Sequence, residues 1–314
     1  MSLLVAVGDL NPEPWRRRLS ASLPGREIAT PETLGDPADV HYGLSWRHKP
    51  GAFENLPHLR AIFSLGAGVD HALGDPRLPD APLVRVVDAD LTARMSEWVV
   101  LHALLHLRQF RRYDRQQREK IWDDDESQPA AGDVRVGVLG LGEIGCDAAR
   151  KLQALGFDVA GWTRTPRAIP GLPTFAGEAG LDALLGRTDI LVNLLPLTPQ
   201  TRGLLNRGLI GKLAGDGRLG GPVLVNAGRG GSQVEADIVA ALLSGALKGA
   251  SLDVFETEPL PETSPLWSME NVFLSPHNAG MSEPEAVARY IAGQILAFER
   301  GEPLRNVVDR TRGY

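Results

Sequence analysis

Short apolar runs recur along the chain, and most are followed by turn residues and then by a segment with helical periodicity. In the first part of the chain these runs are Leu3–Val7, Val40–Leu44, Arg60–Ser64 and Leu83–Val87. Gly, Pro and Asp residues separate them, which is typical of short buried strands. Because strands alternate with other elements, this part is expected to form a small parallel α/β sheet.

A long segment without Gly or Pro follows, from Ser96 to Lys120. It is apolar on one face at first and basic and polar later, so we expect one connecting helix. The next residues, Trp122–Gly132, are acidic and then contain Pro, Ala and Gly. This composition favours an exposed loop at a domain boundary.

A second series of buried strands is predicted after that loop. The candidate runs span residues 134–140, 157–162, 189–196, 222–228, 249–255 and 271–276. Parallel strands in this number suggest the doubly wound sheet of a Rossmann-type domain. A final helix is expected from Pro284 to Arg300, and the tail after it is expected to pack back on the first unit.

Composition and charge restrict the class of protein. The chain has 314 residues, or roughly two folding units at about 150 residues per domain. Its net charge of −6 provides no broad basic surface, so neither nucleic acid nor an anionic membrane is an expected partner. No apolar stretch approaches the roughly 18 residues that a membrane span needs. The single cysteine, Cys146, cannot form an internal disulfide, and a cytoplasmic location is expected.

The first motif with chemical content is Gly140-x-Gly142-x-x-Gly145, between a valine-rich strand and a helical run. The first glycine allows a tight turn, the second lets the backbone approach a phosphate, and the third lets helix and strand pack closely. Backbone N–H groups at the helix N-terminus would then face a pyrophosphate. The pattern alone is weak, but its place between strand and helix predicts a dinucleotide site.

The end of the next strand indicates which dinucleotide binds. An NAD site usually has an acidic residue about 20 residues after the glycine motif, where it binds the ribose 2′-hydroxyl. No acid stands at this strand end, and Asp158 opens the strand instead. The strand ends in Thr163, Arg164, Thr165 and, after a proline, Arg167. Hydroxyl and guanidinium groups can hold a 2′-phosphate, so NADPH is the predicted cofactor, with NAD possible.

Polar residues follow three further predicted strands, at Asn226–Gly230, Asp253–Pro259 and Ser275–Asn278. In a doubly wound sheet, ligands bind outside these carboxyl ends. Together with the glycine motif, the three runs resemble the D-2-hydroxyacid dehydrogenase family, whose members reduce 2-oxo acids with a nicotinamide cofactor. The resemblance covers nearly the whole chain. Within the family, the glyoxylate/hydroxypyruvate reductase A branch is resembled at residues 64–70, 95–100, 162–164 and 309–314.

The resemblance implies a two-domain α/β architecture. A Rossmann nucleotide-binding domain, residues 101–279, would be inserted in a smaller flavodoxin-like α/β substrate domain made of residues 1–100 and 280–314. Family members are generally dimers through the nucleotide-binding unit and hold the substrate in the cleft between the two domains. A homodimer acting on a small 2-oxo acid is therefore expected.

The resemblance also implies the catalytic roles. Arg229 would bind the substrate, His277 would be the acid/base, and Glu258 would be the partner of the histidine. A planar guanidinium can grip a carboxylate and polarise the neighbouring carbonyl. An imidazolium can donate a proton as charge develops on the carbonyl oxygen, and a nearby carboxylate favours that charged form and orients the ring.

Further residues are expected around the cofactor and the substrate. The cofactor set is Gly140, Leu141, Gly142, Glu143, Ile144, Gly145, Thr163, Arg164, Thr165, Arg167, Leu195, Pro196, Ala227, Gly228, Arg229, Asp253 and His277. Asp253 is also predicted to cap or brace its strand end. The substrate set adds the glycine-rich turn Leu65, Gly66, Ala67 and Gly68, which resembles the carboxylate-binding loop of the family, where backbone amides form an anion nest. Trp46 either packs in the core or forms a wall of the substrate pocket.

No metal site is expected. His102 and His106 have a helical i, i+4 spacing that could bind a metal, but no third ligand accompanies them. The four consecutive acids Asp123–Glu126 are typical of a solvated turn.

Taken together, the motifs and the resemblance predict an NADPH-dependent reductase of glyoxylate or hydroxypyruvate. The alternatives are an NAD-linked dehydrogenase for another 2-oxo acid and a cofactor-sensing binding protein like the corepressors that share this fold.

Overall fold

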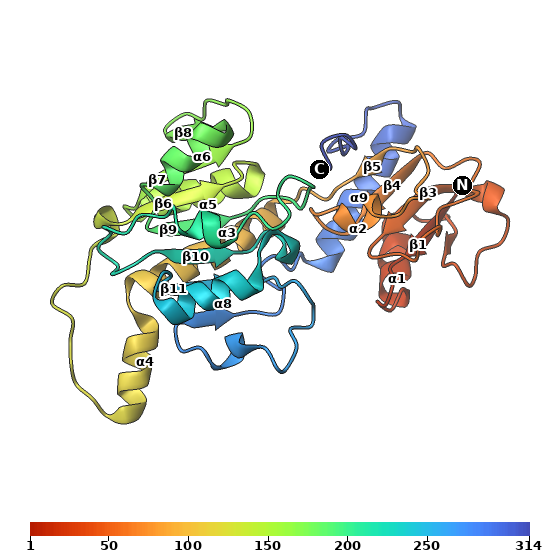
Figure 1. Ribbon diagram of the computed structural model, residues 1–314. Helices are drawn as coiled ribbons and strands as arrows, with labels where there is room; N and C mark the ends of the chain where they lie inside the picture. The colour runs from red at the N-terminus through yellow and green to blue at the C-terminus, as the bar shows by residue number, and fades with distance from the viewer. The chain divides into compact units, whose positions relative to one another are not determined.

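The computed structural model describes all 314 residues, and the chain divides into two compact units. The first unit contains Met1–Leu91 and Ser282–Tyr314, and the second contains Thr92–Met281. Each unit is a parallel sheet flanked by helices (Figure 1). The predicted α/β class, with a doubly wound sheet in the second unit, is confirmed.

The chain passes from the first unit to the second inside a helix, α3 (Ala89–Leu107), between Leu91 and Thr92. It returns to the first unit between Met281 and Ser282. The loop of residues 122–132 lies wholly within the second unit, so its predicted place at a domain boundary is wrong. Acidic and Pro/Gly-rich composition identifies a loop, but the boundary depends on which sheet the apolar face of α3 packs against.

The sheet of the first unit has five strands in the order β2-β1-β3-β4-β5. Their bounds are β1 (Ser2–Ala6), β2 (Ile28–Ala29), β3 (Val40–Ser45), β4 (Ala61–Ser64) and β5 (Leu83–Val84). The four predicted strands are present and all their pairings are parallel. The strand β2 was not predicted because its two residues are too few to show a periodicity.

Two helices, α1 (Glu13–Ser22) and α9 (Pro284–Glu299), cover one face of this sheet. The final helix that the sequence predicts is α9. Leu19 from α1 and Ile291 from α9 pack with Leu3 and Val5 of β1. The opposite face of the sheet carries the short helix α2 (Asp70–Leu73) and loop residues. Both faces are therefore buried, which explains why the strands are continuous apolar runs.

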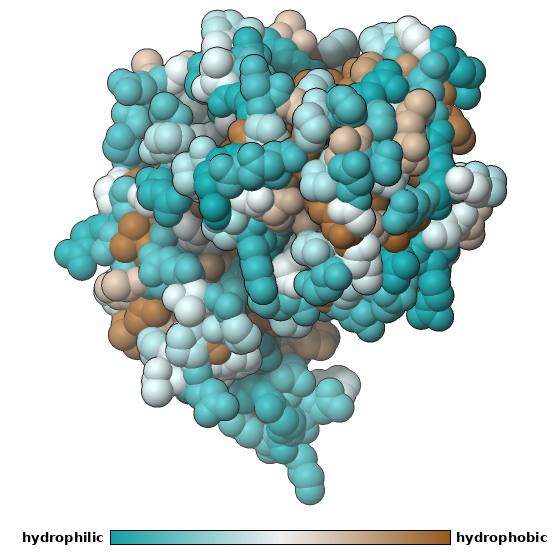
Figure 2. Space-filling model, turned by 90° about the vertical axis from the view of Figure 1, so that its right-hand side faces the viewer, coloured by the Kyte–Doolittle hydropathy of each residue, from teal (hydrophilic) through white to brown (hydrophobic).

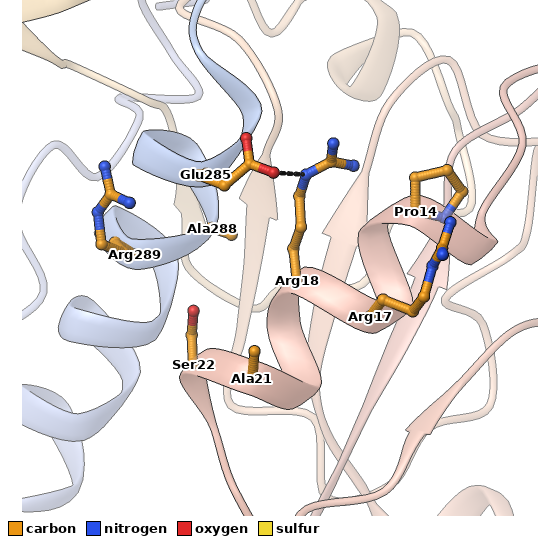
Figure 3. A pocket seen from close by; sticks show the side chains of 8 residues that line it. All are labelled: Pro14, Arg17, Arg18, Ala21, Ser22, Glu285, Ala288 and Arg289. Carbon is orange, nitrogen blue, oxygen red and sulfur yellow. Dashed lines mark hydrogen bonds and ion pairs between the residues drawn. The ribbon is translucent and has the colours of Figure 1, made fainter.

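A groove of about 560 Å³ lies between α1 and α9 (Figure 3). Small side chains, including Ala21 and Ala288, line it, and the guanidinium of Arg18 donates to the carboxylate of Glu285 across it at 2.8 Å. Both charged side chains are partly exposed, so water screens their attraction. The groove follows from two helices that meet over small residues.

The second unit contains seven parallel strands in the order β12-β11-β10-β9-β6-β7-β8. Their bounds are β6 (Arg135–Leu139), β7 (Asp158–Thr163), β8 (Thr174–Ala176), β9 (Ile190–Asn193), β10 (Val223–Asn226), β11 (Gly249–Leu252) and β12 (Val272–Leu274). The six predicted strands are present. The edge strand β8 was missed because it is short and only half-buried.

The helices of this unit lie on both faces of the sheet (Figure 1). Besides α3 they are α4 (Phe110–Glu119), α5 (Glu143–Ala154), α6 (Gly177–Leu185), α7 (Arg207–Ile210) and α8 (Glu235–Ser244). Within β9, Ile190 and Val192 pack in the cluster that contains α3 and α5, whereas Leu191 packs in the cluster that contains α6, α7 and α8. Four short 3-10 helices complete the chain: η1 (Pro37–Asp39), η2 (Ala131–Asp133), η3 (Gly230–Ser232) and η4 (Pro265–Ser268).

The single connecting helix that we expected from Ser96 is two helices, so this prediction is wrong. α3 begins earlier, at Ala89, and α4 follows it after a break at Gln109, whose φ is +51°. The apolar face ends at Leu107, and beyond it the polar α4 projects away from the sheet (Figure 1). The side-chain amide of Gln109 donates to Asp125 of the following loop, at 2.5 Å.

The tail after α9 packs on the first unit, as expected. The N–H of Val308 donates to the carbonyl of Leu83 at 2.8 Å, and Val307 forms an antiparallel bridge with Val84. Arg310 donates to the carbonyl of Pro79 at 2.7 Å. The tail therefore extends the edge of the first sheet.

Exposed apolar residues are scattered over a mainly hydrophilic surface (Figure 2). None of the helices combines the length and the apolar character that crossing a membrane requires.

Two histidines, His102 buried and His106 half-buried, tie α3 to β11. Nδ1 of His102 and Nε2 of His106 lie 2.8 and 2.9 Å from the hydroxyl oxygen of Ser251. Burial lowers the pKa of His102 to about 4 and also lowers the pKa of His106. Both rings are therefore neutral at pH 7 and serve the packing, as their lack of a third ligand suggested.

We predict that these histidines destabilise the fold in acid. The unfolded chain takes up their protons near pH 6.5, whereas folded His102 does so only near pH 4. Between these values the unfolded state binds more protons than the folded state. As the pH is lowered through this range, the free energy of unfolding therefore falls by about 1.4 kcal/mol per pH unit for each histidine. The double variant His102→Asn, His106→Gln keeps hydrogen-bonding groups near Ser251 but does not titrate. Urea unfolding at pH 7.5, 6 and 5 should show a shallower loss for the variant, and equal slopes would contradict the assignment.

Candidate active site

The glycine turn follows β6 and leads into α5. Gly140 has a φ of +94°, and a Cβ on Gly145 would lie 1.9 Å from the carbonyl oxygen of Gly140. Only glycine fits these two positions without a backbone shift. A Cβ on Gly142, which caps α5, would meet nothing within 4 Å. This open space at a helix N-terminus fits the pyrophosphate of a dinucleotide.

The polar residues predicted to select the cofactor lie beside this turn, because β7 pairs with β6 and ends at Thr163. Nη1 of Arg167 donates to the carbonyl of Leu141 at 2.9 Å, which holds the arginine against the glycine turn. The hydroxyl of Thr163 donates to the carbonyl of Thr165 at 2.8 Å, and Arg164 is exposed on the same loop. Asp158 opens β7 and pairs with Arg187, so its carboxylate is at the other end of the strand.

The predicted cofactor residues that follow β9 and β10 approach the turn from the other side. A Cβ on Gly140 would lie 3.2 Å from the side chain of Leu195, and one on Gly228 would lie 2.9 Å from the carbonyl oxygen of Leu195. Leu195 and Ala227 are both buried. These residues therefore form one packed layer beside the glycine turn.

Arg229 follows β10, and a buried polar network fixes its backbone. The carbonyl of Arg229 accepts from the hydroxyl of Ser232 at 2.6 Å. Nδ2 of Asn193, which ends β9, donates to Oδ1 of Asn226 at 2.9 Å and to that same hydroxyl oxygen at 3.1 Å. Nδ2 of Asn226 donates to Gln233 at 2.8 Å. The other four residues of this network, Asn193, Asn226, Ser232 and Gln233, are all buried, which makes the network rigid.

Sequence reasoning missed Asn193, Ser232 and Gln233. A signal was present, since β9 and β10 both end in Leu-Val-Asn and the two asparagines are partners in the sheet register. A buried side-chain amide must find a hydrogen-bond partner. Because these two amides lie at the same level of adjacent strands, each can serve as the partner of the other.

His277 and Glu258 form a hydrogen-bonded pair. Nδ1 of His277 lies 2.8 Å from Oε2 and 3.0 Å from Oε1 of Glu258. The other ring nitrogen, Nε2, is therefore the one left to exchange a proton with a ligand. About a third of the histidine side chain and a fifth of the glutamate side chain are exposed, so the pair is reachable from solvent.

Three adjacent strands bring the predicted catalytic residues to one edge of the sheet. Asn226 at the end of β10 is level with Leu252 of β11, which is level with Leu274 of β12. The loops after these strands carry Arg229, Glu258 and His277 respectively. The loops after β10 and β11 touch, because a Cβ on Gly230 would lie 1.7 Å from the carbonyl oxygen of Phe255.

Asp253 holds the loop after β12. Its buried carboxylate accepts from the hydroxyl of Ser275 at 2.6 Å and from the N–H groups of Asn278 and Ala279 at 2.9 and 3.1 Å. The structure thus shows the bracing role that was predicted for Asp253. Its expected contact with the cofactor stays a prediction.

The predicted substrate residues of the first unit lie together in that unit. A Cβ on Gly66 would lie 2.8 Å from the ring of Trp46, so the indole covers the glycine-rich turn. Trp46 also lies beside His71, with ring centroids 5.0 Å apart, and it is half-buried. The N–H groups of Ala67 and Gly68 make no hydrogen bond within the chain. Such amides in a glycine turn can bind an anion.

Comparison with known proteins identifies the family of the chain. A family model for the NAD binding domain of D-isomer specific 2-hydroxyacid dehydrogenases matches residues 100–279. The chain is 38% identical to glyoxylate/hydroxypyruvate reductase A of Serratia proteamaculans over 100% of both chains. It is 39% identical to the protein of the same name from Klebsiella pneumoniae over 96% of both chains.

Solved structures resemble the chain over its whole length. A probable 2-hydroxyacid dehydrogenase from Rhizobium etli, in complex with NADP, HEPES and L(+)-tartaric acid, has a TM-score of 0.94 and 48% identity, covering 100% of this chain and 99% of that one. An NADPH-dependent glyoxylate/hydroxypyruvate reductase from Sinorhizobium meliloti, in complex with NADP and sulfate, has a TM-score of 0.92 and 50% identity over 100% of both chains. The chain therefore belongs to the D-isomer specific 2-hydroxyacid dehydrogenase family, in its glyoxylate/hydroxypyruvate reductase A-like branch.

Proposed function

We propose that this protein is an NADPH-dependent reductase of a small 2-oxo acid, converting glyoxylate to glycolate and hydroxypyruvate to D-glycerate. The observation that carries the proposal is the His277–Glu258 pair, at the same sheet edge as the glycine turn and Arg229. The relatives named as reductases of these two acids support it further. They support neither the NAD-linked alternative nor the corepressor-like one.

The residues of the site would divide the reaction between them. The guanidinium of Arg229 binds the carboxylate of the oxo acid and polarises its carbonyl. NADPH, held at the glycine turn of Gly140, Gly142 and Gly145, would supply the hydride that the carbonyl carbon needs. Protonated His277 gives the proton on Nε2 to the carbonyl oxygen, which completes the hydroxyl group. Glu258 accepts the bond from Nδ1–H, orients the ring and stabilises the imidazolium before transfer.

Residues of the first unit would complete substrate binding. The free N–H groups of Ala67 and Gly68 are suited to a carboxylate, and Leu65 and Gly66 set the shape of that turn. Trp46 covers the turn and would restrict the size of the group next to the carbonyl. We assign these residues to the substrate because a small polar acid fits a cradle made of backbone amides.

The cofactor preference would depend on the loop after β7. Thr163, Arg164, Thr165 and Arg167 supply hydroxyl and guanidinium groups and no carboxylate. Arg167 is held at the glycine turn by its bond to Leu141. A 2′-phosphate would gain charge-assisted hydrogen bonds there, whereas the ribose 2′-hydroxyl of NADH would find no acidic acceptor.

We also propose that the enzyme is a cytoplasmic homodimer. Leu101, Phe110, Ile121 and Trp122, on α3, α4 and the loop after it, are large apolar side chains that are at least about half exposed, and Trp122 is fully exposed. Large apolar side chains that are exposed on neighbouring segments of the chain favour contact with another chain. The resemblance to dimeric family members through this unit supports a second copy as that partner. The one cysteine of the chain, Cys146, is a buried free thiol, which suits a reducing compartment.

The purified protein should oxidise NADPH in the presence of glyoxylate or hydroxypyruvate. NADPH should be preferred to NADH in kcat/KM by about 10-fold or more, because a 2′-phosphate held by an arginine gains charge-assisted bonds. A spectrophotometric assay at 340 nm with both acids, a bulkier 2-oxo acid and both cofactors measures this. Absence of NADPH oxidation with every short 2-oxo acid would overturn the proposal and favour a binding protein.

A variant of the cofactor loop tests whether Arg164 causes the preference for NADPH. Arg164→Gln should lower kcat/KM for NADPH by about 10-fold and leave the value for NADH nearly unchanged. A parallel loss with both cofactors would show that Arg164 does not contact the 2′-phosphate.

Replacing Glu258 should slow the chemical step more than it weakens binding. Glu258→Gln keeps an oxygen that can accept from Nδ1–H of His277 but removes the carboxylate charge that pairs with the protonated ring. We expect kcat for the oxo acid to fall by about 10-fold or more while the KM for NADPH stays the same. The matched control is Glu262→Gln, an exposed residue of the same loop, which should keep the wild-type kcat. An unchanged kcat in Glu258→Gln would remove Glu258 from the mechanism.

Light scattering should give about twice the chain mass of 33.8 kDa for the purified protein. Trp122→Glu should raise the dissociation constant of the dimer by about 10-fold or more, because it places a charge at an apolar contact. Leu243→Glu, on the exposed side of α8, is the control and should leave the mass unchanged. A monomeric wild type would overturn the dimer proposal.

A further inference from the structure

A polar stripe runs along one side of α3. Trp98, His102 and His106 are spaced four residues apart and so lie on the same face of the helix. The rings of Trp98 and His102 lie against each other with centroids 3.9 Å apart and their planes tilted by 38°, and both histidines contact the ring of Phe273 in β12. The two histidines bond to Ser251, whereas the indole N–H of Trp98 donates to the hydroxyl of Ser275 at 3.1 Å. Trp98 is thus the member of the stripe that reaches the loop of His277.

The hydroxyl of Ser275 has a fixed direction. An indole N–H can only donate, so the oxygen of Ser275 must accept from Trp98. The hydroxyl proton is then given to Oδ1 of Asp253, at 2.6 Å. A serine that is both acceptor from a tryptophan and donor to a buried carboxylate cannot rotate without breaking a bond. This chain of bonds joins α3 to Asp253.

Asp253 in turn sets the backbone around His277. Its carboxylate accepts from the N–H groups of Asn278 and Ala279, and its carbonyl accepts from the N–H of His277 at 2.8 Å. His277 has a φ of +54°, a left-handed conformation that a side chain bearing a Cβ adopts only when its surroundings require it. This conformation directs Nδ1 toward Glu258. The bonds to Asp253 therefore hold the histidine in its pairing geometry.

We infer that Trp98 and Ser275 are positioning residues for His277. Their hydrogen bonds hold the carboxylate of Asp253 in place. That carboxylate holds the left-handed turn at His277, and the turn aligns the imidazole with Glu258. The inference rests on the proposed function, in which His277 donates the proton. Neither residue contacts the reacting atoms in this assignment, and both act through the loop after β12.

The competing explanation is that these bonds only join α3 to the sheet. Ser251 provides a matched control, because its buried hydroxyl also bonds to side chains of α3 and belongs to the neighbouring strand. It makes no bond to Asp253 or to the loop of residues 275–279. Loss of either hydroxyl should lower the free energy of unfolding, but only loss of the Ser275 hydroxyl should change how the His277 imidazole is held.

The test compares Ser275→Ala, Trp98→Phe and Ser251→Ala in the full-length enzyme. We expect Ser275→Ala to lower kcat for the oxo acid by about 10-fold, as the loss of a buried hydrogen bond that acts in the transition state would do. The alkaline limb of its kcat profile should move to lower pH, and the KM for NADPH should not change. Trp98→Phe should shift kcat and the alkaline limb of its profile in the same direction by a smaller amount. Ser275→Thr, which keeps the hydroxyl, should restore them.

The Ser251→Ala control should lower the urea midpoint of unfolding and leave kcat and its pH profile as in the wild type. If Ser275→Ala and Trp98→Phe behave as Ser251→Ala does, the positioning role is excluded while the proposed function stands. An inactive wild type would contradict the proposed function instead. The titration midpoint of the His277 imidazole, measured by NMR in the full chain, then decides the positioning role without an activity assay. A lower midpoint in Ser275→Ala, but not in Ser251→Ala, supports it, and equal midpoints in the two variants exclude it.

Discussion

The parallel alignment of the seven strands in the second unit is the constraint on which the site depends. Parallel strands all end at one edge of a sheet, so residues distant in sequence meet there when the strands are level. The register keeps Asn193 level with Asn226 and Leu252 level with Leu274. Without that register, the loops that carry Arg229, Glu258 and His277 would not converge, whatever their sequences.

Buried polar side chains at the strand ends convert this alignment into fixed loops. Asn193, Asn226 and Asp253 are almost fully buried at the ends of three adjacent strands. A buried polar group without a partner is costly, so each one requires a specific arrangement of the neighbouring loop. The amide pair fixes the backbone of Arg229, and the carboxylate fixes that of His277. The same groups that satisfy each other also restrict the positions of the catalytic side chains.

The glycine residues act in the opposite way, by leaving space. Gly145 and Gly230 permit close contact between backbones, since a Cβ at either would lie less than 2 Å from a carbonyl oxygen. Gly142 leaves open space where a pyrophosphate would lie. The site is thus formed by tight contacts inside the chain and by one gap at the N-terminus of α5.

The sequence by itself determined the α/β class, six strands of the second sheet and the glycine turn, because apolar periodicity and turn residues are local properties. The pairing candidates Glu258 and His277 were implied by the resemblance of their motifs to a known family. The sequence did not determine the short strands β2 and β8, the break at Gln109 or the passage between units inside α3, which depend on packing against distant residues. The hydrogen bonds of Asn193, Ser275 and Trp98 were likewise decided only by the tertiary structure. A polar residue next to a strand is visible in the sequence, but its partner is chosen by which strands lie side by side and at what level.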